Sequence, residues 1–526
     1  MKKKILAIMM ILILSVMAVA CGKQTSDNTG DKNDKDKQEI TKVTFPLEEP
    51  TTFTMLACVP GANYPYEENT TMLELSKMTN VTFEYTSVLK SDLSEKKNLI
   101  LNSGTYPEVL FKCDMNDADM SSLGKQGILL ELTDLIKAHA PNLCKLLDER
   151  DLWKAMADGD GNIYSLPSLG VPFQANSPIW INQVWMDNLG IKEQPKNLDE
   201  LYDLLVAFKT QDPNKNGVKD EIPLGILGTS LLDAILPYIT NSYDAASRTA
   251  IDEEGNLYYV PTSEAYKKAL TFLAKCYDAG LCIKSAFSID SQQVVATGSS
   301  GDVYGCVFAQ GAASVVGVKQ CDKYVMLHPF EENTLQKSNA FKKGTLCITD
   351  ACENPEIIIA WADYLYSEEG SIMQRLGVKD VTYKVNADGS YDFILDSDLG
   401  DSTSAIRNGH TLFGAVDNPG LTPDYWYTGM NATTNPSDVI VNQERYKLLE
   451  KLCEARPIVS YTEEQSKEMA LIVADSSGLI KQYAAYVIIG SKNLSSSWNE
   501  YIQELQAMGI DKLENIYQEA YNVAKK

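Results

Sequence analysis

Residues 53–112 (FTMLACVPGANYPYEENTTMLELSKMTNVTFEYTSVLKSDLSEKKNLILNSGTYPEVLFK) carry a repeating pattern of apolar side chains. Apolar residues alternate along 53–57 and 81–85, which is typical of strands, and they recur at helical spacing from Met72 to Met78. Residues 91–101 predict a second helix, and residues 108–112 predict a third, short strand. This order of strand, helix, strand, helix and strand predicts a mostly parallel α/β sheet with right-handed connections.

Two loops of this segment are expected at a ligand-binding edge, because ligands of such sheets bind beyond the carboxyl ends of the strands. The first loop, residues 60–67, contains the candidate ligand-binding residues Asn63 and Tyr64. The second, residues 113–120, contains the candidate Asp114 together with Asp117 and Asp119. The three acidic side chains predict negative charge where a ligand would enter.

The rest of the chain continues the mixture of helices and turns. Asn197 with Glu200 predicts a capped helix start, and Asn354-Pro355 predicts another. Three Asp-Gly or Glu-Gly pairs, each followed closely by tyrosine, predict hairpin turns: Asp160-Gly161, Glu254-Gly255 and Asp388-Gly389. The last hundred residues are expected to be helical from Glu463 onward.

The N-terminus carries an export signal. Three lysines precede an apolar run of about 14 residues, which is shorter than the roughly 20 needed to span a bilayer. The sequence Ala18-Val-Ala-Cys21 then resembles the lipobox of bacterial lipoproteins, in which this cysteine carries the lipid. We therefore expect a signal peptide at 1–20, lipidation of Cys21, and a flexible polar tether at 21–42 on the extracellular face of the cell membrane.

Composition limits the function classes. Removal of the signal lysines changes the formal net charge from −24 to −27, which disfavours nucleic acid as a partner. A mature chain of about 500 residues is too long for a single core and predicts two lobes. Ten cysteines remain after Cys21, scattered and without a CxxC pair, and they are expected to be mostly free core thiols.

Several segments resemble one family in order along the chain: residues 102–109, 161–167, 179–190 and 498–501. They are similar to extracellular solute-binding lipoproteins of bacterial ABC sugar importers, related to alginate-binding proteins. The resemblance implies a periplasmic-binding-protein type II fold of two α/β lobes that close on a sugar and dock on ABC permease subunits. It places lobe one at 43–170, lobe two at 171–345, a return to lobe one at 346–415, and a helical C-terminal part at 416–526 packing mainly on lobe two.

Residues 212–221 (DPNKNGVKDE) predict a hard-cation site, because oxygen donors stand at positions 1, 3 and 5 before a glycine at position 6. Proline replaces the usual glutamate at position 12, so the loop is not an EF-hand. Alginate-binding relatives hold calcium in a similar loop, which implies a structural Ca²⁺ bound by Asp212, Asn214, Asn216, the Val218 carbonyl, Asp220 and Glu221. The alternative is a plain polar turn. No catalytic cofactor is expected.

A sugar site needs flat apolar faces and paired polar groups. Trp180 and Asn182 are expected on one face of a strand at 179–183. Tyr425 and Trp426 stand in a segment rich in Pro, Gly and Asn, where a core residue is unusual. Together with the overall charge, these candidates predict binding of a neutral or basic oligosaccharide.

The main alternatives are a surface-anchored glycoside hydrolase and a glycan-binding lipoprotein without a role in transport. Paired carboxylates of a hydrolase would be hard to recognise among 71 acidic residues. The sequence has no HExxH or GxSxG motif and no Gly-rich phosphate loop. An adhesin would predict repeats, which are not visible. A binding protein that is not an enzyme is therefore the preferred interpretation.

Overall fold

A computed structural model describes residues 42–173, 177–330, 335–396, 398–414 and 416–525, and residues 42–526 form one compact unit. The predicted signal peptide, the lipidation site Cys21 and nearly all of the predicted tether lie outside the described residues.

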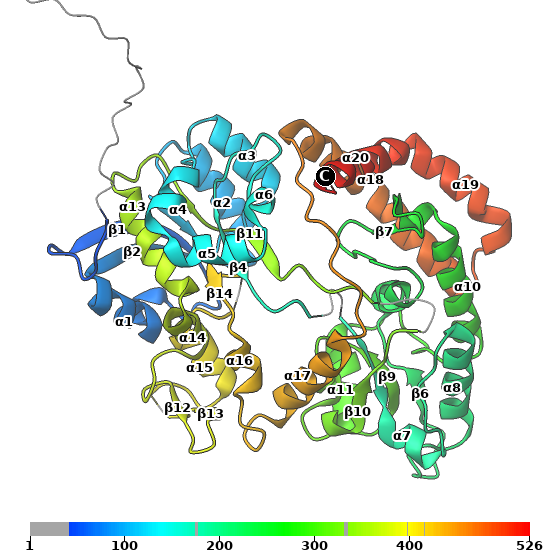
Figure 1. Cartoon of the computed structure of the whole chain (residues 1–526). Coiled ribbons are helices and arrows are strands. Elements are labelled where there is room, and N and C mark those ends of the chain that lie inside the picture. Colours follow the sequence, from blue (N-terminus) through cyan, green and yellow to red (C-terminus); the bar gives the residue numbers. More distant parts are fainter. Residues whose placement is uncertain (1–41, 174–176, 331–334, 397, 415, 526) are drawn as a thin grey trace, which may run out of the picture. The chain divides into compact units, whose positions relative to one another are not determined.

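The N-terminal segment forms the predicted parallel sheet. Strands β1 (Thr51–Val59), β2 (Val81–Leu89) and β3 (Val109–Phe111) are parallel, with β1 between the other two, and α1 (Thr70–Thr79) and α2 (Leu93–Asn102) connect them. Phe53 lies opposite Phe83 in this register. The order β14-β4-β11-β3-β1-β2 completes a six-stranded sheet, with β4 (Leu166–Leu169), β11 (Phe341–Ile348) and β14 (Gly420–Leu421) (Figure 1).

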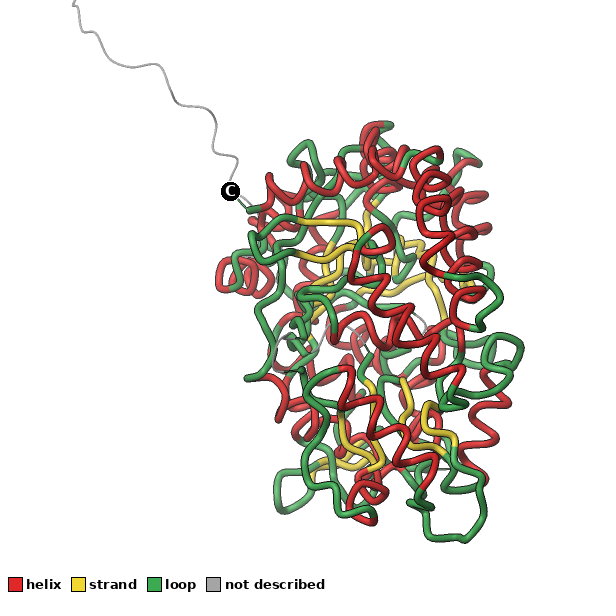
Figure 2. Tube along the Cα trace, turned by 90° about the vertical axis from the view of Figure 1, so that its right-hand side faces the viewer, coloured by secondary structure: helices red, strands yellow, loops and turns green. Residues whose placement is uncertain are grey.

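Helices cover both faces of this sheet because alternate strand residues are apolar on each side. One core contains Phe53, Met55 and Trp361, and a second core on the other side contains Leu56, Cys58 and Leu110. Besides α1 and α2, the covering helices are α3 (Asp117–Lys125), α4 (Thr133–His139), α5 (Pro141–Glu149), α6 (Trp153–Met156), α13 (Pro355–Asp363) and α14 (Glu368–Leu376). Helix α15 (Thr403–His410) packs beside α1. Figure 2 shows the strands enclosed by helices.

A second sheet has the order β10-β5-β9-β6. Its strands are β5 (Ile179–Asn182), β6 (Ile222–Leu224), β9 (Tyr304–Phe308) and β10 (Tyr324–Met326). Strands β6 and β9 are parallel, whereas β5 is antiparallel to β9. The accompanying helices are α7 (Gln183–Asn188), α8 (Leu198–Thr210), α9 (Leu231–Ile235), α10 (Glu264–Asp278), α11 (Ser291–Ser300) and α12 (Ala313–Val316). Asn197 caps α8 as predicted, accepting a hydrogen bond from the Glu200 amide at 2.9 Å.

The predicted C-terminal helices are α18 (Glu463–Ile488), α19 (Leu494–Ala507) and α20 (Ile510–Ala524), which follow α17 (Pro436–Leu449). Thr462 begins α18 with a capping box to Gln465. Tyr483 stacks on Tyr501 with ring centroids 4.0 Å apart. These helices share one apolar core with α8, α10 and the second sheet, and α18 lies along α10 in Figure 1.

The segments that connect the two sheets are hydrogen-bonded to one another. The chain passes to the second sheet between β4 and β5, returns between β10 and β11, and passes again between β14 and α17, which packs beside β10. The Ser338 amide donates to the Phe173 carbonyl at 2.6 Å, and Gln336 pairs with Cys453. The resemblance implied such a third passage, because it placed residues 346–415 in lobe one and residues 416–526 mainly on lobe two.

Two of the three predicted hairpins are present. Gly255 turns between β7 (Thr249–Ile251) and β8 (Leu257–Tyr259), and Gly389 turns between β12 (Tyr383–Val385) and β13 (Tyr391–Phe393). Both glycines have positive φ, 81° and 85°. The Asp160-Gly161 pair also forms a turn, in which the Gly161 amide donates to the Asp158 carbonyl at 3.1 Å, but no strands flank it.

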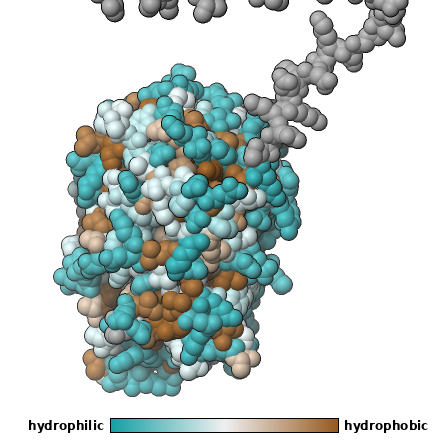
Figure 3. All heavy atoms as spheres, turned by 90° about the vertical axis from the view of Figure 1, so that its left-hand side faces the viewer, coloured by the Kyte–Doolittle hydropathy of each residue, from teal (hydrophilic) through white to brown (hydrophobic). Residues whose placement is uncertain are grey.

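The surface is mainly hydrophilic where Figure 3 shows it, with separate hydrophobic spots. Within the described ranges, no helix combines the length and apolar character required to cross a membrane. The ten cysteines were expected to be mostly free core thiols, and eight of them are buried without a disulfide.

Candidate ligand-binding site

The carboxyl edge of the first sheet brings three distant segments together. Lys112 follows β3, and its buried ammonium donates to the carbonyls of Leu412 and Gly414 at 2.7 Å each. Gly414 lies against Pro60, the residue after β1, so closely that an added Cβ would be 3.4 Å from its ring. The loops after β1 and β3 therefore meet residues 412–414 at this edge.

Burial lowers the pKa of Lys112 to about 7, and the charge of Arg375 acts in the same direction. Its ammonium has carbonyl partners and no carboxylate within ion-pair distance among the described residues. Loss of a proton from Lys112 near neutral pH therefore changes its hydrogen bonds to the carbonyls of Leu412 and Gly414.

Asn63 and Tyr64 lie at this edge, in the loop after β1. Asn63 is exposed and Tyr64 is half-buried. The Tyr64 ring lies beside Gly409, at which an added Cβ would approach the ring to 3.1 Å. Both side chains therefore remain candidates for ligand contact.

The predicted excess of negative charge in the loop after β3 is wrong, because each acidic side chain has a lysine partner. Asp114 pairs with Lys342 at 2.7 Å, Asp117 with Lys343 at 3.1 Å, and Asp119 with Lys97 at 2.8 Å. Asp117 and Asp119 also belong to α3 rather than to a loop. Burial opposes ionisation of Asp114, but Lys342 outweighs it and holds the pKa of this carboxyl below its usual range.

Trp180 and Asn182 do not form the predicted ligand platform, since both side chains are fully buried in the second sheet. The Trp180 indole donates to the Ala309 carbonyl at 3.0 Å. Asn182 caps α7 by accepting from the Trp185 amide at 3.1 Å. Because β5 runs antiparallel to β9, Asn182 lies beside the start of β9, at the edge opposite the carboxyl ends of β6 and β9.

A polar cluster that the sequence did not reveal lies at the carboxyl end of β9. Gln310 is exposed, and its amide donates to the Ser177 hydroxyl at 2.9 Å. Its carbonyl oxygen accepts from the Arg445 guanidinium at 2.7 Å. Arg445 in turn lies over the Phe173 ring, 5.6 Å from the centroid.

Two half-buried tyrosines extend this cluster. Tyr427 and Tyr446 each meet the Phe173 ring edge-to-face at 5.0 Å. Burial raises the pKa of Tyr427, while Arg375 and Arg445 partly offset that effect. Aromatic surface beside hydrogen-bonding groups is what a sugar site requires. The residues of this polar and aromatic cluster come from four distant segments of the chain. In the sequence, only the aromatic run 425–427 indicated a ligand site.

The predicted platform at Tyr425 and Trp426 is a short helix, α16 (Asp424–Thr428), rather than a loop. Trp426 is buried in a small core with Phe393 and Phe413, and Arg407 lies 4.7 Å from its ring centroid. This placement contradicts its predicted role as an open stacking surface. Tyr425 is half-buried and donates to the Gly389 carbonyl at 2.9 Å, so it supports the β12–β13 hairpin.

The candidate cation loop, residues 212–221, has no regular secondary structure and folds around its own side chains. Asp212 accepts from the amide of Asn216 at 3.2 Å, and Asn216 accepts from the Val218 amide at 2.6 Å. The side-chain amides of Asn214 and Asn216 donate to Asp220 at 3.2 and 3.1 Å. The oxygens of both amides accept from main-chain amides of the loop, and a bound cation would replace the two amide bonds to Asp220.

Glu221 gives the strongest structural indication of a cation. Its side chain is 1% exposed, and its Oε1 atom has no hydrogen-bond partner among the described residues. A buried carboxylate oxygen without a partner is unfavourable unless a cation or water satisfies it. The described residues contain no cluster of three or more His, Cys, Asp or Glu suited to a metal. A cation would therefore rely on amide and main-chain oxygens as well, and such a set suits Ca²⁺.

Comparison with known proteins agrees with this architecture. The family model of bacterial extracellular solute-binding proteins matches residues 74–372, which is more than half of the chain. A fructooligosaccharide ABC transporter substrate-binding protein, FusA of Streptococcus pneumoniae, is 28% identical, and the match covers 98% of this chain and 97% of that protein.

Solved structures show the same fold. A FusA EF-hand mutant in complex with fructo-nystose matches with a TM-score of 0.71 and 25% identity, over 90% of this chain and 99% of the other. An extracellular solute-binding protein from Bifidobacterium longum subsp. infantis matches with a TM-score of 0.77 and 21% identity, over 91% of this chain and 99% of the other. The expected type II solute-binding fold is thus confirmed, and the chain belongs to the family of bacterial extracellular solute-binding proteins.

Proposed function

We propose that this chain is the substrate-binding component of an ABC importer and that it captures an oligosaccharide for delivery to permease subunits. The observation that supports this best is the match to FusA, which runs over 98% of the chain. The parts built on the six-stranded and four-stranded sheets serve as the two lobes. Residues 346–415 return to lobe one, and the C-terminal helices extend the core of lobe two.

The ligand contacts in this proposal come from the carboxyl edges of both sheets. Tyr427 and Tyr446 offer aromatic surface for the C–H faces of sugar rings. Gln310 and Arg445 offer donors and an acceptor for hydroxyl groups. Asn63 and Tyr64 contribute from the first sheet. A neutral oligosaccharide fits this set, because the acidic side chains near the first edge are paired with lysines.

Thermal-shift titration with kestose, a human milk oligosaccharide and an N-glycan tests the proposal. A true ligand at about 100 times its Kd should stabilise the protein by about 2.7 kcal/mol. Gln310→Ala should reduce that stabilisation, whereas Gln443→Ala, an exposed glutamine on α17, should not. Absence of any shift across these glycans would contradict the proposal. Chromatography of the same samples tests the hydrolase alternative, which requires loss of the oligosaccharide.

The proposed location is the extracellular face of the cell membrane, with a lipid on Cys21. Cys21→Ala should release the protein into the medium, while Cys58→Ala, which changes a buried thiol, should not. Membrane association of the Cys21 variant would contradict lipidation at this residue.

The proposed cofactor is a structural Ca²⁺ in the loop 212–221. The support consists of the spacing of the oxygen donors, the unpartnered Glu221 oxygen and the EF-hand named for a FusA structure. The ion would neutralise carboxylates that otherwise repel one another. It would hold the connection between α8 and β6 and take no part in chemistry on the ligand.

A further inference from the structure

The loop 212–221 needs support from outside itself. Asp212 and Lys215 adopt left-handed backbone conformations, with φ values of 50° and 55°. Such conformations are unfavourable for residues other than glycine and persist where surrounding contacts hold them. Most loop residues are exposed, so packing within the loop supplies little of that support.

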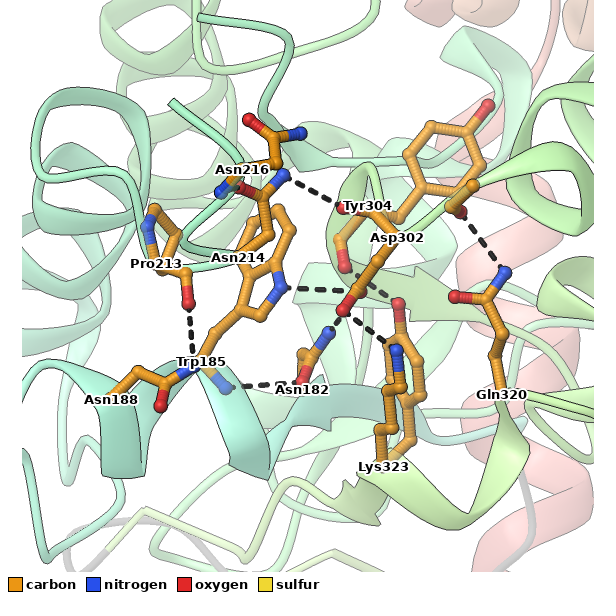
Figure 4. Close-up of polar contacts among 12 residues, drawn as sticks. Asn182, Trp185, Asn188, Pro213, Asn214, Asn216, Asp302, Tyr304, Gln320 and Lys323 are labelled. Atoms are coloured by element: carbon orange, nitrogen blue, oxygen red, sulfur yellow. Dashed lines mark hydrogen bonds and ion pairs between the residues drawn. The ribbon is translucent and has the colours of Figure 1, made fainter. Parts of the chain in front are cut away.

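Two side-chain contacts attach the loop to the second sheet (Figure 4). Asn188, at the end of α7, donates from its side-chain amide to the Pro213 carbonyl at 2.8 Å. Asn214 donates from its amide to the main-chain carbonyl of Asp302 at 3.0 Å. Because this bond fixes the nitrogen side of the Asn214 amide, the Oδ1 atom of Asn214 faces the loop and accepts from the Asn216 amide at 3.2 Å.

Asp302 is itself held firmly just before β9. Its Oδ1 atom accepts from the Asn182 amide at 2.9 Å and from the Trp185 indole at 3.1 Å, and its Oδ2 atom pairs with Lys323 at 2.8 Å (Figure 4). Both carboxylate oxygens are thus used by protein donors, and the Asp302 carboxylate is not free to bind a cation. What Asp302 offers the loop is a fixed main-chain carbonyl.

We infer that Asp302 and Asn188 are positioning residues of the cation loop, which hold Asn214 and Pro213 against the second sheet and so set the affinity for Ca²⁺ without touching the ion. This inference rests on the proposed calcium site. It implies that the second sheet and the cation stabilise each other, because thermodynamic coupling between two sites is reciprocal. Partners that orient metal ligands typically change metal affinity by about 10–100-fold.

Calcium titration by isothermal calorimetry on the full mature chain tests the inference. Asp302→Ala should raise the Kd for Ca²⁺ at least about tenfold. Asn188→Ala should raise it about threefold, because Asn188 holds Pro213, which is not a proposed ligand, and the contact of Asn214 with Asp302 remains. Asp302→Asn keeps an acceptor oxygen for Asn182 and Trp185 and should stay within about threefold of wild type. Asp322→Ala is the matched control, since it removes an exposed carboxylate from the same segment as Lys323 and should leave the Kd unchanged.

Melting in EDTA and in calcium separates positioning from a general loss of stability. Asp302→Ala should melt earlier in EDTA, and its calcium-induced rise in melting temperature should also be smaller than in wild type. A wild-type Kd in both Asp302→Ala and Asn188→Ala would overturn the inference and leave the calcium site standing. Failure of the wild-type protein to bind Ca²⁺ would overturn both. If Asp302→Ala does not fold, the comparison of Asn188→Ala with Asp322→Ala decides.

Discussion

The two edges of the four-stranded sheet use their polar groups differently. Where β9 begins, Asn182, Trp185 and Lys323 all donate to Asp302, and little polar capacity is left for a ligand. Where β9 ends, Gln310 is exposed and Arg445 is half-buried beside aromatic rings. In the proposed function, the edge where β9 begins attaches the cation loop, and the edge where β9 ends offers surface and hydrogen-bonding groups to a ligand.

This difference follows from strand direction. A residue type that suits sugar binding, such as tryptophan or asparagine, can contact a ligand only if it lies at the accessible edge of its sheet. Strand β5 begins near the carboxyl end of β9 and ends near the start of that strand. Asn182 consequently becomes a capping residue. Trp180 lies opposite Val307, near the carboxyl end of β9, and is unavailable because a core covers its face of the sheet.

The largest effect is expected for Trp180→Ala. Removal of a fully buried tryptophan should lower the free energy of unfolding by about 3–5 kcal/mol. Ligand affinity of the folded variant should be unchanged, because the indole contacts the core and the Ala309 carbonyl. Urea unfolding and calorimetry at low temperature measure the two quantities. Weakened binding at unchanged stability would show that Trp180 contacts the ligand.

Chelation of calcium should give the next largest effect. If free Ca²⁺ is about 100 times its Kd, EDTA should remove about 2.7 kcal/mol of stability. Asp212→Ala should abolish the sensitivity to EDTA while ligand affinity stays nearly the same. Asp160→Ala is the matched control, since Asp160 stands in a similarly spaced turn but pairs with Lys125 at 2.9 Å. An equal melting temperature of the wild type with and without EDTA would show that residues 212–221 form a polar turn without a bound cation.

Tyr427→Ala should weaken oligosaccharide binding by about 2 kcal/mol, as expected for a central aromatic contact. Tyr425→Ala serves as the control, because Tyr425 faces the β12–β13 hairpin and should not affect the Kd. Calorimetric titration with the best glycan from the thermal-shift screen measures both. A larger loss of affinity in Tyr425→Ala than in Tyr427→Ala would place the ligand at Tyr425, the residue that the sequence favoured.

The smallest effect concerns pH and the edge of the first sheet. The pKa of Lys112 is about 7 in the folded protein and about 10.5 in an unfolded chain. Above pH 7 the unfolded chain therefore binds more protons, and the contribution of Lys112 to stability rises with pH up to the unfolded pKa. Between pH 6 and 8, the stability of wild type relative to Lys112→Met should increase by about 1 kcal/mol. A difference that is constant with pH would contradict the low pKa.

Sequence by itself determined the local features of this protein. Alternating and helical periodicities predicted β1, α1, β2, α2 and β3 in order. An element with one buried and one exposed face repeats apolar residues at the period of its secondary structure. Asn197 marked the start of α8, and the spacing of oxygen donors marked the loop 212–221. These signals depend on residues close together in the chain, so they need no knowledge of the remaining fold.

Which candidates are accessible at the surface depends on contacts between distant parts of the chain. Alternation places Trp180 on one face of a strand but does not say what covers that face. The Pro-, Gly- and Asn-rich composition around Trp426 likewise gave no sign that this side chain is buried. The lysines that pair with Asp114 and Asp117 come from β11, more than 200 residues later, and neutralise the charge on which a prediction had relied. Phe173, Gln310, Tyr427 and Arg445 meet only because strand direction and the connecting segments bring four distant parts of the chain to one edge.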